Sequence, residues 1–369
     1  SSEGFFMPNS GVKMDNLKRS DVNVVSAEPL ITPADLIKQY PVGELASATV
    51  LSGRQQVADI LDGRDDRLIV VTGPCSIHNE DLALEYAEKL CGLAKEVQDR
   101  LLVVMRVYFE KPRTTVGWKG LLYDPQLNDS FNIEEGLGLS RSIMIKIAEM
   151  GMFAGTEFLD PIVPQYLADL VSWGTIGART TESQIHRQMA SGLSMPVGFK
   201  NGTDGNTQIA IDAITSCRSA HGFLGIDIQG QTSIIKTSGN PHGHLVLRGG
   251  SSGPNYSSTF VEDARAQMEG SGITPNIIID CSHGNSNKDH TKQATAFKDV
   301  VSQKARGNSS IVGSMLESNI NEGNQKLTSD PSELLHGVSI TDACINWDEN
   351  TELLHWAFDA LGEANKVTA

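Results

Sequence analysis

The feature that most constrains the fold of this chain is a repeated alternation between short apolar runs and longer amphipathic segments. Eight apolar runs have the length of β-strands, namely Leu68–Thr72, Leu101–Tyr108, Phe153–Phe158, Gly174–Gly177, Val197–Lys200, Leu245–Arg248, Asn276–Cys281 and Ser310–Met315. Helical patterns lie between and after them, at Asp81–Val97, Ile133–Met150, Gln165–Ser172, Ser183–Ser191, Thr207–Ala220, Thr259–Glu269, His290–Lys304 and Thr351–Ala364. Strands that alternate with helices form a parallel sheet, and eight such strands can close into a (β/α)8 TIM barrel. We therefore predict an α/β fold of this class.

An open, doubly wound sheet is the alternative arrangement. Its dinucleotide-binding form carries the motif GxGxxG after the first strand. Here the first predicted strand is followed by Gly73-Pro-Cys-Ser-Ile-His78 instead. The sequence therefore favours the closed barrel.

The predicted barrel occupies residues 66–369, and residues 1–65 precede it. Those first residues begin as a polar arm, and two helices follow. The first helix opens with Thr32 as its N-cap and Pro33 at its first position, and the second lies around 48–61. We expect this N-terminal part to serve regulation or oligomerisation.

One further addition interrupts the barrel pattern. His221–Asp227 and Thr232–Thr237 are strand-like and flank Gln229-Gly230. This arrangement predicts a β-hairpin at about 221–237, inserted before the sixth barrel strand.

The overall charge excludes some classes of partner. Lys and Arg number 30 and Asp and Glu number 45, which gives a net charge of −15. This balance argues against nucleic acid or an anionic membrane as the main partner. The five cysteines are far apart and form no CxxC pair, so we expect no disulfide framework and a reducing, cytoplasmic location. The sequence also lacks an apolar run long enough to span a membrane.

The ends of the predicted strands carry charged or metal-binding residues, and in a barrel these ends meet on one face. Six of these residues are cations: Arg106, Lys111, Arg113, Arg179, Lys200 and Arg248. Pro112 stiffens the turn that holds two of them. Six cations on one rim repel one another unless anions lie between them, which predicts a site for a phosphate and a carboxylate, or for two phosphates. The alternative is a set of ion pairs with acids such as Glu157 and Asp160.

A second group on the same rim is Cys75, His283, Glu317 and Asp342. A thiolate, an imidazole and two carboxylates suit a borderline divalent ion. The four residues are far apart in the sequence and match no local zinc motif. Their common place on the predicted rim therefore carries the prediction of a metal site.

At these residues the chain resembles the type I, aromatic-amino-acid-regulated 3-deoxy-D-arabino-heptulosonate 7-phosphate (DAHP) synthases. The likeness runs from about residue 30 to about residue 360. The matching stretches are Gly73-Pro-Cys-Ser-Ile-His78, Arg106-Val-Tyr-Phe-Glu-Lys-Pro-Arg-Thr114, Gly177-Ala-Arg179, Phe199-Lys-Asn-Gly202, Leu247-Arg-Gly-Gly250, Pro254-Asn-Tyr256, Ser282-His-Gly-Asn285 and Ser339-Ile-Thr-Asp-Ala343.

The resemblance implies a transferase that condenses phosphoenolpyruvate with erythrose 4-phosphate and water, giving DAHP and phosphate, as the first step of the shikimate pathway. It implies one divalent ion (Mn, Fe, Co or Zn) on Cys75, His283, Glu317 and Asp342. In such a site Arg106 and Lys200 would hold the carboxylate of phosphoenolpyruvate, while Arg179, Arg248 and the backbone at Ala178 would hold its phosphate. Arg113 and Thr114 would hold the erythrose phosphate, and Asp342 would be a substrate-binding residue as well as a metal ligand. Lys111 would protonate the aldehyde oxygen, and Glu157 would orient the water.

The resemblance also implies a homodimer or homotetramer that is feedback-inhibited by an aromatic amino acid. The positions that match the effector site are Asp21, Phe158, Gln165, Leu193, Ser194, Phe223, Gly225 and Ile235. Phenylalanine-responsive members commonly have serine where this chain has Gly225, and the extra room favours tyrosine as the effector. The alternative is that the arm and the hairpin only pack the oligomer.

Three other functions compete with this interpretation. A related synthase would use arabinose 5-phosphate, but the run Lys111-Pro-Arg-Thr114 and the long arm favour erythrose 4-phosphate. A metal-dependent sugar-phosphate aldolase would require several zinc-binding histidines. A non-catalytic barrel that senses sugar phosphates would not need the four-residue metal site.

Overall fold

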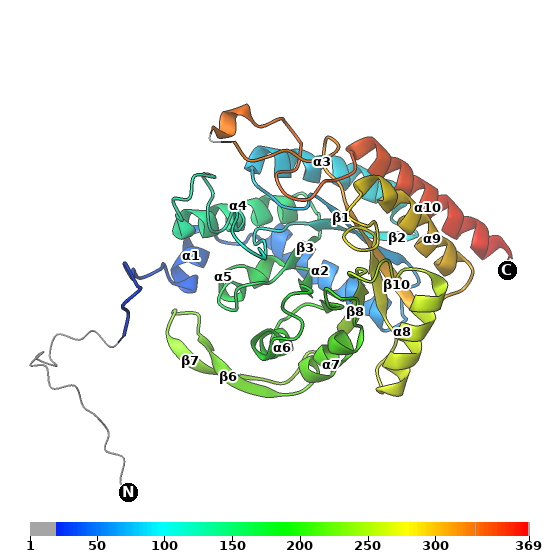
Figure 1. Cartoon of the computed structure of the whole chain (residues 1–369), viewed down its shortest axis with the longest axis horizontal. Helices are drawn as coiled ribbons and strands as arrows, with labels where there is room; N and C mark the ends of the chain where they lie inside the picture. The colour runs from blue at the N-terminus through cyan, green and yellow to red at the C-terminus, as the bar shows by residue number, and fades with distance from the viewer. Residues whose placement is uncertain (1–19, 329, 368–369) are drawn as a thin grey trace, which may run out of the picture.

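The computed structural model describes residues 20–328 and 330–367 of the chain, with side chains as far as Glu363. Eight parallel strands close into a barrel in the order β1-β10-β9-β8-β5-β4-β3-β2 (Figure 1). Their bounds are β1 Leu68–Gly73, β2 Leu101–Arg106, β3 Ala154–Glu157, β4 Trp173–Ile176, β5 Val197–Lys200, β8 Gly243–Leu247, β9 Ile277–Asp280 and β10 Ile311–Glu317. The predicted barrel is confirmed, and the open sheet is wrong.

All residues of the eight barrel strands are buried. Helices cover the outside of the barrel, and side chains fill its interior, so neither face of a strand meets water. This explains why the strands appear in the sequence as continuous apolar runs rather than as alternating patterns. The covering helices are α3 Glu80–Val97, α4 Ile133–Glu149, α6 Gln184–Ser191, α7 Gln208–Cys217, α8 Ser258–Gly270, α9 Gln293–Ala305 and α10 Trp347–Val367 (Figure 1).

Helix α2 (Glu44–Leu61) closes the end of the barrel at which the strands begin. Its apolar residues join the interior cluster of the barrel, which comprises Val57, Ile60, Leu61, Ile69, Val71, Leu102, Val104, Trp173, Val246, Ile278, Val312 and Met315. Asn276, which precedes β9, donates its side-chain amide to the carbonyl oxygen of Leu61 at 2.8 Å. A Cβ on Gly53 would lie 2.5 Å from Ser172 Oγ, so glycine permits this close approach. The helix leaves only the opposite end of the barrel open for a site.

The connection between β3 and β4 departs from the predicted single helix Gln165–Ser172. It forms a short α5 (Pro164–Leu167) followed by a 3-10 turn, η2 (Ala168–Leu170). Distant arginines bind the carbonyl groups that a longer helix would use. Arg141 donates to Tyr166 O at 2.9 Å, and Arg54 donates to Ala168 O at 2.6 Å and to Val171 O at 2.9 Å.

The two additions to the barrel lie near each other. Helix α1 (Pro33–Gln39) begins as predicted, because the Thr32 side chain accepts a hydrogen bond from Asp35 N and Pro33 follows it. The hairpin pairs β6 (His221–Ile226) with β7 (Thr232–Thr237) in antiparallel register and projects beside the barrel (Figure 1). Ala34 N donates to Ile228 O at the hairpin tip, at 2.9 Å. The start of α1 therefore packs on the hairpin.

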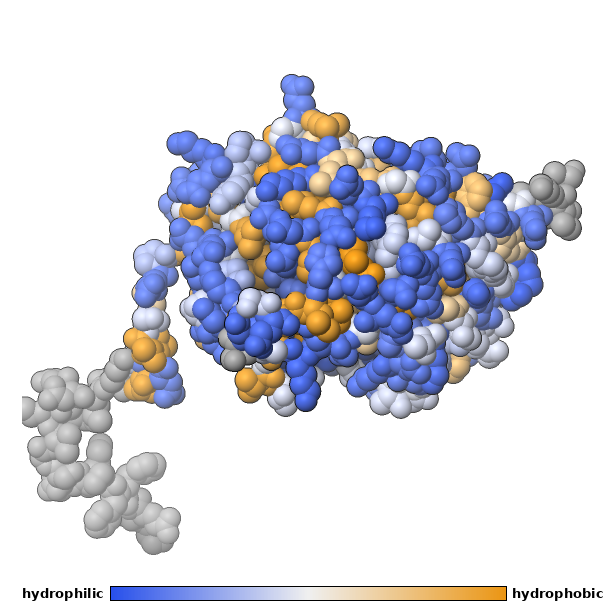
Figure 2. All heavy atoms as spheres, turned by 90° about the horizontal axis from the view of Figure 1, so that it is seen from above, coloured by the Kyte–Doolittle hydropathy of each residue, from blue (hydrophilic) through white to orange (hydrophobic). Residues whose placement is uncertain are grey.

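The described part of the N-terminal arm is exposed and extends away from the barrel (Figure 1). Its apolar side chains Val22, Val24 and Val25 are solvent-exposed, and apolar groups of the arm protrude beside the barrel in Figure 2. On the hairpin, Leu224 and Ile234 are cross-strand partners and are also exposed. Among the helices that the structure describes, none is both long and apolar enough to cross a membrane.

Candidate active site

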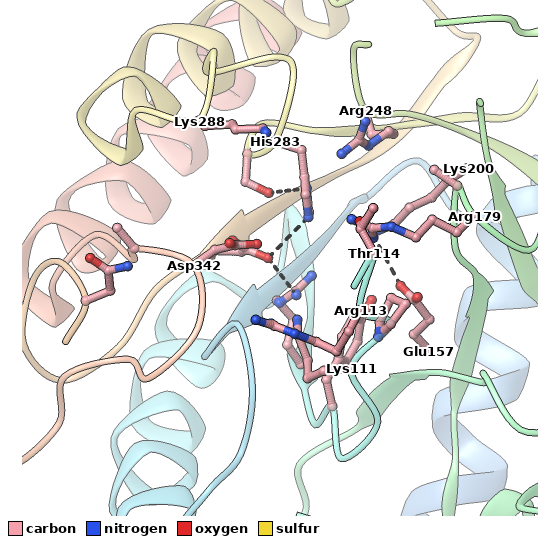
Figure 3. Close-up of a pocket in the computed structure, with 18 of the residues that line it drawn as sticks. Lys111, Arg113, Thr114, Glu157, Arg179, Lys200, Arg248, His283, Lys288 and Asp342 are labelled. Atoms are coloured by element: carbon pink, nitrogen blue, oxygen red, sulfur yellow. Dashed lines mark hydrogen bonds and ion pairs between the residues drawn. The ribbon is translucent and has the colours of Figure 1, made fainter. Parts of the chain in front are cut away.

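A cavity of about 490 Å³ opens at the end of the barrel where the strands finish. All six predicted cations line it, and Thr114, Glu157, Ala178, His283, Glu317 and Asp342 line it as well. Figure 3 shows Arg179, Lys200 and Arg248 on one side, His283 and Asp342 on another, and Lys111 and Arg113 entering from below. Cys75 is fully buried and is not one of the lining residues. The strand ends therefore converge as the sequence predicted.

Arg106 ends β2 and is buried at the base of the cavity. Its Nη2 lies 3.0 Å from Glu317 Oε1, and its guanidinium stacks 4.1 Å from the centre of the Tyr108 ring. Burial by itself lowers the pKa of Arg106, but Tyr108 and Glu317 more than offset this effect, so its pKa is raised and the group stays charged. Its Nη1 is buried without a hydrogen-bond partner. A buried donor without a partner is costly, and a bound anion would satisfy it.

Lys200 ends β5 between two acids. Its Nζ lies 3.3 Å from Asp280 Oδ2 and 3.6 Å from Glu157 Oε2. A Cβ on Gly177 would collide with the Glu157 carboxylate, so the glycine makes room for it. The predicted alternative of ion pairs is thus partly correct, since Glu157 does pair with one cation.

Arg248 follows β8 and is held by asparagine side chains. Asn201 Oδ1 accepts from Arg248 N at 2.8 Å, and Asn255 donates to the same oxygen at 3.2 Å. Asn255 N in turn donates to Asn285 Oδ1 at 2.7 Å. Burial lowers the pKa of the Arg248 guanidinium, and its Nε is buried without a partner. The network fixes the backbone while the side chain keeps a free donor.

Three of the four predicted metal ligands come together. One ligand atom each from Cys75, Glu317 and Asp342 lies within 4.8 Å of the other two. His283 lies outside this cluster, although its Nε2 is 3.7 Å from Glu317 Oε1. Lys111 covers the thiol, with its Nζ 3.2 Å from Cys75 Sγ. Burial raises the pKa of the Cys75 thiol, and nearby Glu317 raises it further, while Lys111 acts in the opposite direction.

The orientation of His283 follows from its neighbours. Ser282 Oγ donates to Asp280 Oδ1 at 2.6 Å, and Ser282 Oγ also lies 2.7 Å from His283 Nδ1. Because the serine proton goes to the carboxylate, Nδ1 must carry the hydrogen of the second bond. His283 Nε2 therefore presents its lone pair on the side of Glu317. Histidine ligands are typically held in this way, through the nitrogen that does not bind the metal. The donor set of sulfur, imidazole and carboxylates thus fits a borderline divalent ion.

Asp280 is a functional residue that the sequence reasoning missed. It is fully buried and lies 3.0 Å from His283 Nδ1 through its Oδ2. Burial opposes its ionisation, but His283, Lys200 and Arg106 together hold the pKa of its carboxyl well below the usual value. The signal in the sequence was a single aspartate closing the apolar run of β9. Other residues that line the cavity had no predicted role, among them Tyr108, Glu110, Thr115, Val116, Ser286, Lys288, His290, Gln293, Asn324 and Ala343.

The predicted effector positions lie on several elements. Phe158 is buried directly after β3, Gln165 belongs to α5, and Leu193 and Ser194 precede β5. On the hairpin, Phe223 and Ile235 are cross-strand partners, and Gly225 pairs with Ser233. The base of the hairpin is attached to α6, because Ser191 Oγ lies 2.6 Å from Thr237 Oγ1. Asp21 lies on the exposed arm. The effector site stays a prediction.

Comparison with known proteins gives consistent matches over most of the chain. The DAHP synthetase I family model matches residues 41–355. The Tyr-sensitive phospho-2-dehydro-3-deoxyheptonate aldolase of Escherichia coli (strain K12) is 51% identical over 335 residues, which cover 91% of this chain and 94% of that protein. The Phe-sensitive protein of the same strain is 49% identical over 346 residues, which cover 94% of this chain and 98% of that protein.

A solved structure supports the same assignment. The phospho-2-dehydro-3-deoxyheptonate aldolase of Francisella tularensis SCHU S4 superposes with a TM-score of 0.90 at 46% identity, covering 92% of this chain and 99% of that one. The family match spans far more than half of the chain, and it includes every residue that lines the cavity. This chain belongs to the DAHP synthetase I family.

Proposed function

We propose that the protein is a DAHP synthase, which condenses phosphoenolpyruvate with erythrose 4-phosphate and water and releases phosphate. The observation that carries this proposal is the convergence of six cations, two carboxylates and a histidine in one cavity, with the buried thiol of Cys75 close to the two carboxylates. Two phosphorylated substrates bring several negative charges into one space, and fixed cations offset their repulsion.

The buried donors support the position of phosphoenolpyruvate. Arg106 and Lys200 would hold its carboxylate, and Arg106 Nη1 offers a free donor. Arg179 and Arg248 would hold its phosphate, with the backbone at Ala178. Arg248 Nε offers a second buried donor without a partner. Binding would satisfy both groups at once.

The second substrate would lie between the phosphoenolpyruvate site and the mouth of the cavity. Arg113 and Thr114, both exposed on the segment after β2, would hold its phosphate. A divalent ion on Cys75, His283, Glu317 and Asp342 would act as a Lewis acid on the aldehyde oxygen. Lys111 would donate a proton to that oxygen. Its pKa is raised because Cys75, Glu317 and Asp342 outweigh the effect of burial, so the ammonium form needed for donation prevails.

The bond changes follow from these positions. The enol carbon of phosphoenolpyruvate attacks the aldehyde carbon, and the aldehyde oxygen takes the proton from Lys111. Water adds to the carbon that bears the phosphate, where positive charge develops. The tetrahedral intermediate then expels phosphate: the C–O bond to phosphate breaks as the oxygen that came from water forms the ketone C=O. Of the two protons of that water, one leaves with the phosphate and the other replaces the proton given by Lys111. Glu157, held beside Lys200, would orient that water.

We also propose feedback inhibition by an aromatic amino acid, with tyrosine as the effector, in a homodimer or homotetramer. The named sensitivities of the relatives to Tyr, Trp or Phe support an aromatic effector. Gly225 supports a site with extra room on the hairpin.

The substrate assignment is tested by following phosphate release with phosphoenolpyruvate and one aldose phosphate at a time. Erythrose 4-phosphate should give rapid release and arabinose 5-phosphate little. Rapid release with arabinose 5-phosphate alone would identify the related synthase instead. Binding of both substrates without any release would indicate a sensing barrel.

A further inference from the structure

Glu110 is a buried acid of the cavity that the proposed reaction does not use. It directly precedes Lys111, and its side chain points across to the segment after β3. Its Oε2 accepts from Leu159 N at 3.2 Å, and its Oε1 accepts from Asp160 N at 3.0 Å. One carboxyl group therefore links the segment that carries Lys111 and Arg113 to a neighbouring strand end.

Tyr123 completes this link in a way that constrains its protons. The phenol oxygen lies 3.2 Å from Glu110 Oε1 and 3.3 Å from Asp160 Oδ2. A phenol has one hydrogen to donate. The phenol can therefore donate to only one carboxyl group at a time, and the second contact becomes a hydrogen bond when the other carboxyl group is protonated and donates to the phenol oxygen.

The proton belongs on Glu110 rather than on Asp160. Glu110 is 3% exposed, whereas Asp160 is partly exposed to solvent. Burial, the largest effect, raises the pKa of Glu110 to about 8, although the two backbone N–H groups oppose this shift. The hydrogen bonds then run from protonated Glu110 to Tyr123 and from Tyr123 to a charged Asp160.

The surroundings of Glu110 hold few other charges. On its own segment Lys111 turns away to Cys75, and on the returning segment Lys119 contributes its carbonyl oxygen to Lys111 N at 2.8 Å. On α6, His186 Nε2 lies 2.6 Å from Leu159 O and so meets the backbone of the β3 segment rather than the carboxyl itself. Asp160 and Tyr123 are therefore the titratable groups in hydrogen-bond contact with Glu110.

The segment that Glu110 holds is a loop closed at its base. Leu122 N donates to Phe109 O at 3.3 Å, and Gly120 lets the two arms approach, because a Cβ there would collide with Phe109 O. Arg113 and Thr114 lie at the exposed far part of this loop. The Glu110 link fixes the base of the loop relative to the barrel.

We propose that protonated Glu110 is a positioning residue for the aldose phosphate, which holds Lys111 and Arg113 in place through Tyr123, Asp160 and the backbone after β3. This inference rests on the proposed function, because it names what positions the second substrate. Loss of the proton places two carboxylates around one phenol hydrogen. The link then weakens, and the loop holds the aldose phosphate less well.

The test compares three variants by steady-state kinetics on the full-length, metal-loaded protein. Glu110→Ala should raise the KM for erythrose 4-phosphate about 5- to 150-fold, the range expected when buried donors lose their partner. The KM for phosphoenolpyruvate should stay within about twofold, since its arginines lie on other strand ends or are held separately. Glu110→Gln cannot ionise, but it offers a single carbonyl oxygen to two backbone N–H groups that bind separate oxygens in the wild type, so its KM for erythrose 4-phosphate at pH 7 should lie between those of the wild type and Glu110→Ala. Glu88→Gln, on the exposed face of α3, is the matched control.

The pH profile provides a readout that a merely structural role would not move. The KM of the wild type for erythrose 4-phosphate should rise between pH 7 and pH 9, and Glu110→Gln should lack this rise. Tyr123→Phe keeps the ring and removes only the hydroxyl group, so it should raise the KM for erythrose 4-phosphate. This variant tests the same link if Glu110→Ala does not fold.

Each contrary outcome overturns a defined claim. An unchanged KM for erythrose 4-phosphate in Tyr123→Phe and in Glu110→Ala would refute the positioning role. A Glu110→Gln variant that keeps the pH rise of the wild type would refute the protonated state. Absence of turnover in the wild type would instead refute the proposed function.

Discussion

The two anion subsites can be separated by removing one arginine from each. Arg248→Ala and Arg113→Ala both delete a guanidinium from the same cavity, so they change the charge equally. Arg248 is already partly desolvated in the free protein, as the lowered pKa of its guanidinium and its unpartnered Nε indicate. A phosphate that meets it regains a hydrogen bond at little further desolvation cost. Loss of such a charge-assisted bond should cost about 1.5–3 kcal/mol, or roughly 10- to 150-fold in affinity.

The assay is calorimetric titration with phosphoenolpyruvate alone, followed by steady-state kinetics for erythrose 4-phosphate. Arg248→Ala should lower the affinity for phosphoenolpyruvate by roughly 10- to 150-fold and leave the KM for erythrose 4-phosphate nearly unchanged. Arg113→Ala should do the reverse. Raised salt should reduce the effect of Arg113→Ala more than that of Arg248→Ala, because Arg113 is exposed to solvent whereas Arg248 is partly buried. Equal losses for both substrates in both variants would refute the assignment of subsites.

Two further predictions concern parts of the molecule outside the cavity. His244 is fully buried, and burial lowers its pKa to about 4, so the unfolded state binds the proton first as the pH falls. Neutral His244 therefore contributes to the free energy of unfolding above pH 6.5. As the pH falls from 6.5 to about 4, this contribution of roughly 3 kcal/mol is lost. Urea unfolding should show that the free energy of unfolding falls less between pH 7 and pH 4.5 in His244→Gln than in the wild type. An equal fall in both proteins would contradict the assignment of this pH dependence to His244. Tyrosine should inhibit the wild type, and Gly225→Ser should change which aromatic amino acid inhibits, because a Cβ there would lie 2.8 Å from Ile235 Cγ1 and shift that side chain. Inhibition by phenylalanine alone would contradict tyrosine as effector, and no response to tyrosine, phenylalanine or tryptophan would contradict the regulation.

The strands were predictable because the barrel buries them completely. A strand covered on both faces needs apolar residues throughout, and this pattern requires no knowledge of distant contacts. The convergence of the six cations followed from the same fact, since parallel strands end on one face. The resemblance to a family then supplied the substrates and the individual roles.

The failures of the sequence-based predictions all involve contacts between distant segments. The helix predicted at Gln165–Ser172 is cut short by Arg54 and Arg141, which bind its carbonyl groups from other helices. The role of α2 in closing the barrel depends on Gly53 and on interior side chains that no local pattern connects. Glu110 gains its partners from the segment after β3 and from Tyr123. Such pairings are set by the closed topology.

The central claim is that one cavity combines anion binding with a metal site to join two substrates. It is tested most directly by measuring phosphate release from phosphoenolpyruvate and erythrose 4-phosphate after treatment with a chelator and during titration with a divalent ion. The account predicts that release stops without metal, returns at about one ion per chain and fails to return in folded Cys75→Ala or His283→Ala. Full turnover in metal-free buffer, or in those variants, would contradict it.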